Sequence, residues 1–255
     1  MKRILIISFA AVAVSACQSV GPNGDTTAAS SGTTAASGGT TAASGGAKSQ
    51  PASQPASSPQ QPKAAVDLKG GTVAATPVED GFEAATFAGG CFWCMEPPFD
   101  EVEGVKSTTS GYTGGPELHP SYKQVAYGRT GHTESIRVVF DPKVVGYDKL
   151  LEVFWRNVNP TDAGGQFVDR GKQYRPAVFV HSDAQKKAAE ASKQALQASG
   201  KFDSKIIVPI QTAGEFWVAE DYHQDFYKKS PARYYGYRRG SGRDQFIARV
   251  WGTSK

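Results

Sequence analysis

Two cysteines three positions apart, Cys91 and Cys94, are the residues of this 255-residue chain that are best suited to chemistry. They follow Gly89-Gly90 at the predicted start of a helix, where the first thiol meets unpaired backbone N–H groups and the positive end of the helix dipole. Both features favour the thiolate. Because a structural zinc site needs four ligands and no second cysteine pair follows, the pattern favours redox or nucleophilic chemistry over a metal site.

The two residues between the cysteines, Phe92 and Trp93, are large and aromatic. A CxxC pair by itself would fit a thioredoxin-like oxidoreductase, although such proteins usually carry a small residue and a proline between the cysteines. Two aromatic side chains beside a nucleophile instead predict an apolar pocket for a small ligand. These residues alone leave a thiol–disulfide oxidoreductase open as an alternative.

A carboxyl group is predicted to point toward the apolar face of a strand at residues 133–140. Glu134 shares its parity with Ile136, Val138 and Phe140, and alternate residues of a strand point to the same face. Burial raises the pKa of a carboxyl group, and a raised carboxyl can donate a proton near neutral pH. Glu134 is therefore a candidate general acid, with a solvated acid at a strand end as the alternative.

Apolar periodicity and Gly or Pro punctuation divide the chain into helices and strands. Strands are predicted at 84–88, 133–140, 177–181 and 206–210, helices at 91–102, 148–157 and 183–199, and loops at 111–122 and 159–171. The predicted class is α+β, with a single compact domain. Its mixed sheet is flanked by helices and followed by a long irregular C-terminal segment, and a disordered tether precedes the domain.

The N-terminal residues predict export and a lipid anchor. A positive start precedes an apolar run too short to span a bilayer as a stable helix. Val14-Ser15-Ala16-Cys17 resembles the bacterial lipobox, which implies a signal peptide at 1–16 and acylation of the Cys17 thiol. An ordinary signal peptide cut after Ala16 is the alternative. With Gln18 next, the expected location is the cell envelope, lipid-anchored at the periplasmic face of the outer membrane.

Composition separates a tether at residues 17–77 from a folded domain at 78–255. Three near copies of TTAASGG begin at positions 26, 33 and 40, and residues 21–77 hold no aromatic side chain. Such a segment buries too little apolar surface to offset its ordering entropy. The net charge of +4 is small for this length, so we expect no nucleic-acid partner.

The stretch GCFWCME at 90–96 resembles the signature of the peptide methionine sulfoxide reductases of the A class. Other stretches are similar to later blocks of that family and follow in the same order: PSYKQV at 120–125, GHTE at 131–134, NPT at 159–161, DRGKQYR at 169–175 and AEDYHQ at 219–224. The resemblance covers residues 84–252. The ordered set is far more specific than any one block.

The resemblance implies a reaction and assigns residues to it. Cys91 would attack the sulfoxide sulfur and become a sulfenic acid, while Glu134 would protonate the oxygen. Tyr122, Asp169 and Tyr174 match family positions that line the oxygen site, with the two tyrosines as hydrogen-bond donors. The expected activity is that of a peptide-methionine (S)-S-oxide reductase, acting on free methionine sulfoxide and on oxidised proteins.

The same resemblance implies how the substrate is held and where electrons come from. Phe92 and Trp93 would hold the methyl group of the sulfoxide. No metal or organic cofactor is implied, and an external thioredoxin-like thiol would supply the electrons. We expect a monomer whose partners are oxidised proteins and peptides, this reductant and, through the lipid anchor, the membrane.

The chain departs from many relatives in holding no cysteine after Cys94. Relatives often carry further cysteines near the C-terminus that resolve the oxidised nucleophile. Since Cys17 is expected to be acylated, Cys94 is the predicted resolving thiol. The alternative is that Cys94 packs inward and an external thiol attacks Cys91 directly.

The aromatic C-terminal part admits a simpler interpretation. The tyrosine run at 234–237 is interpreted as packing, and His132 and His223 are interpreted as structural. A non-enzymatic lipoprotein that binds partners through this aromatic surface is the remaining alternative.

Overall fold

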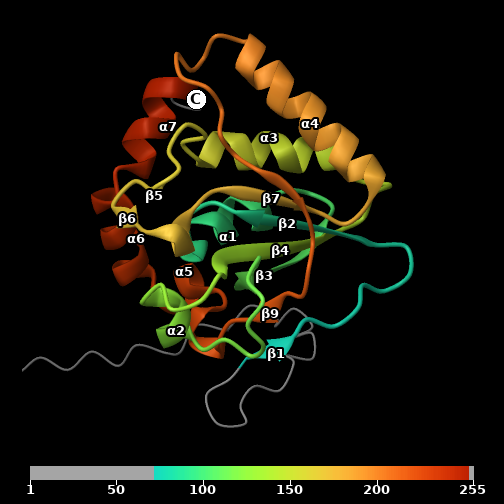
Figure 1. Ribbon diagram of the computed structural model, residues 1–255, viewed down its shortest axis with the longest axis vertical. Helices are drawn as coiled ribbons and strands as arrows, with labels where there is room; N and C mark the ends of the chain where they lie inside the picture. Colours follow the sequence, from blue (N-terminus) through green and yellow to red (C-terminus); the bar gives the residue numbers. More distant parts are fainter. Residues whose placement is uncertain (1–71, 253–255) are drawn as a thin grey trace, which may run out of the picture. The chain divides into compact units, whose positions relative to one another are not determined.

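A mixed seven-stranded sheet runs through the computed structural model, which describes residues 72–252 (Figure 1). Its order is β1-β9-β3-β4-β2-β7-β8, and the described pairs are antiparallel except β7–β8. The bounds are β1 (Val73–Ala74), β2 (Glu83–Ala88), β3 (Val105–Thr113), β4 (Thr133–Phe140), β7 (Ala177–Val180), β8 (Ile210–Thr212) and β9 (Trp217–Val218). A separate hairpin pairs β5 (Gly165–Gln166) with β6 (Asp169–Arg170). The predicted α+β class with a mixed sheet is confirmed.

The folded part begins before residue 78, which was the predicted domain boundary. Val73 and Ala74 pair with Val218 and Trp217 of β9, and the buried Thr72 donates its hydroxyl proton to the Pro120 carbonyl across 2.9 Å. The last residues of the expected tether are therefore part of the domain. The expected signal peptide at 1–16, the Cys17 anchor and the tether up to residue 71 lie outside the described residues.

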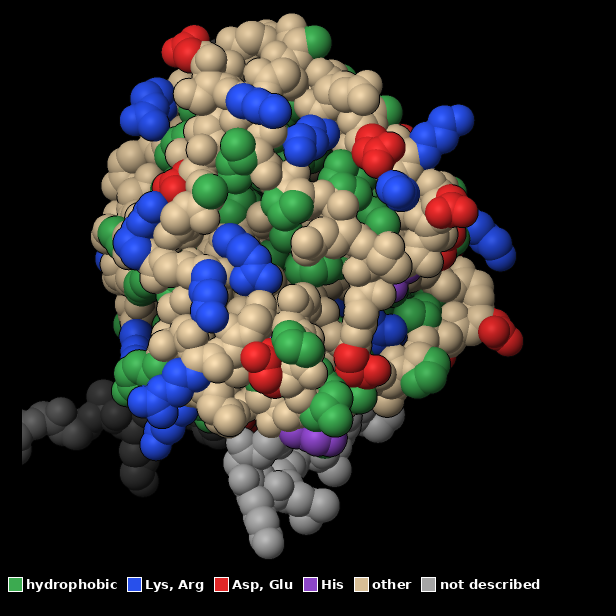
Figure 2. Space-filling view, viewed as in Figure 1, with side chains coloured by type: hydrophobic (Ala, Val, Ile, Leu, Met, Phe, Trp, Pro, Cys, Tyr) green, Lys and Arg blue, Asp and Glu red, His purple; other side chains and the backbone are tan. Residues whose placement is uncertain are grey.

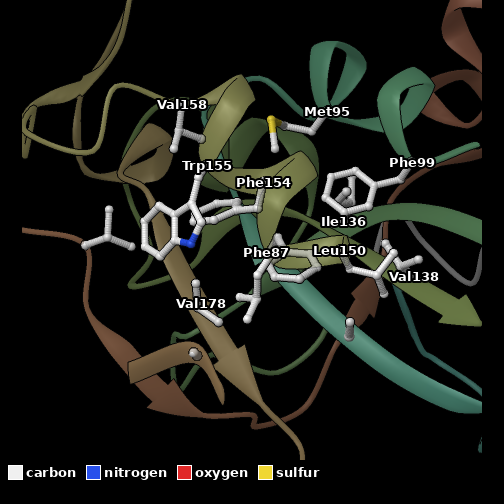
Figure 3. Close-up of a cluster of buried hydrophobic side chains, with 14 of the residues drawn as sticks. Phe87, Met95, Phe99, Ile136, Val138, Leu150, Phe154, Trp155, Val158 and Val178 are labelled. Atoms are coloured by element: carbon white, nitrogen blue, oxygen red, sulfur yellow. The ribbon is translucent and has the colours of Figure 1, made fainter. Parts of the chain in front are cut away.

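Three helices cover one side of the sheet and enclose the main core. They are α1 (Phe92–Asp100), α3 (Tyr147–Asn157) and α4 (Asp183–Ala198), with α3 and α4 side by side in Figure 1. Figure 3 shows the ring of Phe87 between Phe99 and Phe154, with both centroid distances 5.2 Å. Removing such a buried ring typically costs about 3–5 kcal/mol, so this cluster holds α1 and α3 against β2.

The outer helix α4 has the N-cap and the apolar periodicity that the sequence predicted. Ser182 caps it by accepting a hydrogen bond from the Gln185 N–H, and its buried residues are Gln185, Ala189 and Leu196. Most of its other side chains are exposed, and Figure 2 shows charged groups of both signs on the viewed face. None of the helices within residues 72–252 is long and apolar enough to cross a membrane.

A tight turn before α1 places Cys91 at the helix N-cap. Gly90 has a φ of +85°, a conformation that side chains disfavour, and a Cβ there would lie 2.6 Å from Gln166. The predicted helix start is confirmed. The helix runs through Pro97 and Pro98 and ends at Asp100, slightly before the predicted 102, where the Val102 N–H bonds to the Phe99 carbonyl in a tighter turn.

Four predictions about local structure were wrong. The expected loop at 159–171 contains the β5–β6 hairpin. The expected loop at 111–122 begins inside β3, which ends at Thr113, and the strand expected at 206–210 is shifted to 210–212. The expected irregular C-terminal segment forms helices α5 (Phe226–Lys229), α6 (Pro231–Gly240) and α7 (Arg243–Trp251). These helices have weak amphipathic periodicity, and contacts with α1, α3 and one another stabilise them.

Candidate active site

Cys91 and Cys94 lie at the N-terminal end of α1 as free thiols, 7% and 0% exposed, and a side-chain hydrogen bond joins them. Burial, with this hydrogen bond and the nearby carboxyl groups, raises the pKa of Cys91 well above its ordinary value. The hydrogen bond from Cys91 lowers the pKa of Cys94 to about 7. Burial therefore opposes ionisation of Cys91, against the expectation that the helix N-terminus favours its thiolate.

Glu134 reaches the same helix end from β4. Its side chain is 2% exposed, and Oε2 accepts a hydrogen bond from the Phe92 N–H across 3.2 Å. Burial raises the pKa of Glu134 to about 8, so the carboxyl group is mostly protonated at neutral pH. The prediction that Glu134 lies on the buried face with Ile136 and Val138 is confirmed.

Tyr122, Asp169 and Tyr174 arrive from three separate elements. Tyr122 is the first residue of α2 (Tyr122–Ala126), Asp169 begins β6, and Tyr174 ends the 3₁₀ turn η1 (Lys172–Tyr174). Burial and the Glu134 charge raise the pKa of Tyr122 to about 12 and also raise that of Tyr174. Both phenols therefore keep their protons. The charges acting on Tyr174 come from Glu134, Tyr122, Cys91 and Asp169, so the other four predicted catalytic residues lie within electrostatic reach of it.

The chemistry of this group is reduction of an oxygen-bearing centre by a thiol. A sulfur nucleophile lies beside a protonated carboxyl group and two phenol donors, which could protonate and bind an oxygen as it accepts electrons. Within residues 72–252 no set of three or more His, Cys, Asp or Glu side chains is placed to hold a metal ion.

The profile of the family described as "Peptide methionine sulfoxide reductase" matches residues 83–255. The chain belongs to this family. It is 55% identical over 173 residues to "Peptide methionine sulfoxide reductase MsrA" of Listeria welshimeri and 56% identical over 171 residues to that of Bacillus subtilis. These alignments cover 68% and 67% of this chain and 98% and 97% of the relatives.

Solved structures agree with the fold of this peptide methionine sulfoxide reductase. The structure of Mxr1 from Saccharomyces cerevisiae in reduced form matches with a TM-score of 0.57 at 32% identity, covering 61% of this chain and 90% of that one. Methionine sulfoxide reductase A of Corynebacterium diphtheriae matches with a TM-score of 0.52 at 32% identity, covering 60% and 77%. The chain is thus an oxidoreductase that reduces methionine sulfoxide to methionine.

Tyr237 is a residue of the reductase site that sequence reasoning missed. It belongs to α6, within the run interpreted as packing, and its hydroxyl group donates a short hydrogen bond to Oδ2 of Asp169. This bond opposes the effect of burial, which raises the pKa of Asp169. No local pattern indicated the contact, since 68 positions separate the partners.

An aromatic wall flanks the two cysteines of the reductase. Trp93 stacks on Phe226 with a centroid distance of 3.8 Å, and its Nε1 donates to Nδ1 of His223 across 3.1 Å. Burial lowers the pKa of His223 to about 4, so this ring stays neutral and accepts the bond. Phe92 packs behind this wall at 1% exposure, whereas Trp93 is half-buried. Of these two side chains, only the Trp93 indole is therefore partly exposed to solvent.

Two further acids, the half-buried Glu220 and the buried Glu96, hold the reductase site together and were not predicted. Glu220 accepts hydrogen bonds from the Tyr112 hydroxyl and the Tyr122 N–H, each 2.9 Å, and so fixes the start of α2. Glu96 accepts from the Asp225 N–H across 3.0 Å and ties α1 to α5. By contrast, His132 is buried with its ring nitrogens bound to backbone groups of Gly115 and Glu117.

Proposed function

We propose that Cys91 is the nucleophile of this methionine sulfoxide reductase and Glu134 its proton donor. The observation that carries the proposal is the shared position of the two groups at the start of α1, where the Phe92 N–H binds the Glu134 carboxyl group. The family shows the reaction, and this geometry supports the assignment of roles.

In the first step the Cys91 sulfur attacks the sulfoxide and takes its oxygen. The Glu134 proton moves to the oxygen, and the Glu134 carboxylate then takes up the Cys91 thiol proton. Methionine leaves and Cys91 becomes a sulfenic acid, so the substrate sulfur gains the two electrons that Cys91 loses. Tyr122 and Tyr174 donate hydrogen bonds to the oxygen, and Asp169 contributes charge beside them.

The substrate pocket is proposed to select methionine S-sulfoxide, free or in a protein. The half-buried Trp93, held by Phe226 and His223, would contact the methyl group together with the edge of Phe92. Its fixed orientation would present one face of the sulfoxide to Cys91, which supports discrimination between the two sulfur epimers.

In the second step Cys94 is proposed to resolve the sulfenic acid. An S–S bond to Cys91 forms, the S–O bond breaks, and the oxygen leaves as water with the Cys94 proton. The interaction between the two thiols, one at the N-cap and one in the first turn of α1, supports this role. An external thioredoxin-like dithiol would then reduce the disulfide and restore both thiols.

We also propose that the reductase repairs oxidised proteins of the cell envelope as a lipid-anchored monomer. Acylated Cys17 and a tether up to residue 71 would hold the domain near the periplasmic face of the outer membrane. The sequence around Cys17 supports this proposal.

The assay that tests the assignment measures methionine formed from each epimer of methionine sulfoxide by the purified chain, with a dithiol reductant. The wild type should act on the S epimer, and Cys91→Ser should form no methionine above background while retaining its circular dichroism spectrum. Turnover by a folded Cys91→Ser variant would remove Cys91 as the nucleophile.

A further inference from the structure

Arg243 lies beneath the turn that leads into the two cysteines. It is the largest fully buried side chain of the described residues, 1% exposed at the start of α7. Its Nη2 donates to the Gly89 carbonyl across 2.8 Å, and its Nη1 donates to the Asn157 carbonyl and lies 3.4 Å from Sδ of Met95. The guanidinium group therefore contacts chain segments on both sides of the Cys91–Cys94 pair.

This buried cation has no carboxylate partner. Within residues 72–252 no Asp or Glu oxygen lies within ion-pair distance of Arg243, and its Nε has no hydrogen-bond partner. Backbone carbonyls accept from Nη1 and Nη2 but leave a positive charge in the interior with no carboxylate in contact, which is costly. The charge of Asp169 interacts with it from farther away. A thiolate formed at the neighbouring cysteine pair would be a nearby anion.

We propose that Arg243 is a positioning residue that acts through Cys94: its buried charge stabilises the Cys94 thiolate as this thiolate attacks the sulfenic acid on Cys91. The inference rests on the proposed function. In that step Cys94 loses its proton, the Cys94 and Cys91 sulfur atoms form a disulfide, the S–O bond breaks, and the departing hydroxide leaves as water with that proton. Cys94 is oxidised and the Cys91 sulfur is reduced by the same electron pair.

The other charges around Cys94 point to Arg243 as the main contributor. Arg238 donates from Nη1 to the Cys94 carbonyl across 2.9 Å, but its Nε is paired with Asp244 at 2.7 Å, which offsets its charge. Arg243 has no carboxylate in contact; its charge lowers the pKa of Asp169 and, with Arg238, that of Cys94, which the Asp169 charge raises. The titratable and charged groups that act on Cys94 are Cys91, Glu134, Asp169, Tyr234, Tyr237, Arg238 and Arg243.

The test separates the two chemical steps in the full chain. Wild type, Arg243→Met and Arg243→Lys are mixed with one equivalent of methionine sulfoxide without reductant. At set times, methionine, dimedone-trapped sulfenic acid and the Cys91–Cys94 disulfide are measured by mass spectrometry at pH 6 to 10. Arg249→Met is the matched control, because it removes an exposed arginine from the same helix.

Removing the buried charge should slow disulfide formation about tenfold at pH 7. The pH at which the rate of this step is half its maximum, its pH midpoint, should rise by about 1–2 pH units, the usual effect of a nearby opposite charge on a pKa. Arg243→Lys should restore most of the rate, and Arg249→Met should match the wild type. Methionine formation in the first step should change far less. A purely structural role would slow both steps and leave the pH midpoint in place.

Three results would overturn the inference. In the first, a folded Arg243→Met variant forms the disulfide with the wild-type pH midpoint. This refutes the role of Arg243 but not the proposed function, since methionine is still made. In the second, Arg243→Met does not fold, and a folded Arg243→Lys variant forms the disulfide no faster than a charge-free Arg243→Gln variant. This result also refutes the role of Arg243. A persistent sulfenic acid in the wild type removes Cys94 as the resolving thiol. By contrast, absence of methionine in the wild type refutes the proposed function itself.

Discussion

The Phe92 N–H donates a hydrogen bond to Oε2 of Glu134, joining the first residue of α1 to the second residue of β4 across 3.2 Å. The bond holds an acid that burial keeps mostly protonated, with a pKa raised to about 8, beside the Cys91 sulfur. The hydrogen bond from Phe92 favours the charged carboxylate and by itself would lower the pKa of Glu134. Because the pKa is raised, the effect of burial is larger than that of the hydrogen bond. The proposed nucleophile and the proposed proton donor are thus positioned by one contact between backbone and side chain.

Replacing Glu134 with Gln should slow formation of the Cys91 sulfenic acid by about 10²–10⁴-fold, the usual effect of losing a positioned acid. In the wild type the rate should fall as pH rises through about 8, because the acid form is lost there. The variant should lack this decline. Single-turnover kinetics measure both effects, and the exposed Glu103→Gln change serves as control. An unchanged rate would show that the proton comes from another group.

Replacing Cys94 with Ser should leave the first step intact and stop the second. Each chain should form one methionine and then hold a sulfenic acid on Cys91, whereas the wild type should end with a Cys91–Cys94 disulfide. Thiol counting and mass mapping after oxidation without reductant distinguish the two products. A wild-type product with an intact Cys94 thiol would contradict resolution by this residue.

Replacing Tyr237 with Phe should reduce turnover about tenfold, the scale of one hydrogen bond to a charged group. The lost donor stabilises the Asp169 carboxylate, so the pKa of Asp169 should rise further in the variant. A double-mutant cycle with Asp169→Asn should be strongly non-additive. The exposed Tyr235→Phe change on the same helix is the control. Additive losses would mean that Tyr237 does not act through Asp169.

Glu96 should make the protein less stable as pH rises. Burial raises its pKa from 4.5 to about 8, and its Oε2 has no partner among the described residues. Between these values the unfolded chain loses the proton while the folded chain keeps it, so stability falls by up to about 1.4 kcal/mol per pH unit. Glu96→Gln should weaken this fall, as measured by thermal melts from pH 5 to 8. If the melting temperature of Glu96→Gln falls with pH as steeply as those of wild type and the control Glu103→Gln, the prediction is contradicted.

Replacing Cys17 with Ala should move the protein from the membrane fraction to the soluble fraction, because a single acylated residue would carry the anchor. Fractionation of cells that express each form, with signal processing followed by mass, measures the change. Cys94→Ser, which leaves the N-terminus untouched, should remain with the membrane. Equal membrane association of the Cys17→Ala variant would refute lipidation at this position.

Much of the local chemistry of this reductase could be predicted from short stretches of sequence. The Gly89-Gly90 turn, the helix beginning behind Cys91 and the parity of Glu134 depend on backbone geometry over a few residues, and the structure agrees with each of them. The α4 helix was similarly clear, because Ser182 caps it and its periodicity is regular. Local steric and hydrogen-bonding rules are enough for such features.

The charge environment of the site depends on contacts between distant segments, which no periodicity records. Tyr237 reaches Asp169 and Arg243 reaches Gly89 across long stretches of chain, from helices whose own pattern is too weak to predict. The protonation states follow from the same packing: burial opposes ionisation of Cys91, although its place at a helix start favours it. Desolvation depends on everything that surrounds a group, so only the folded molecule determines which thiol ionises first.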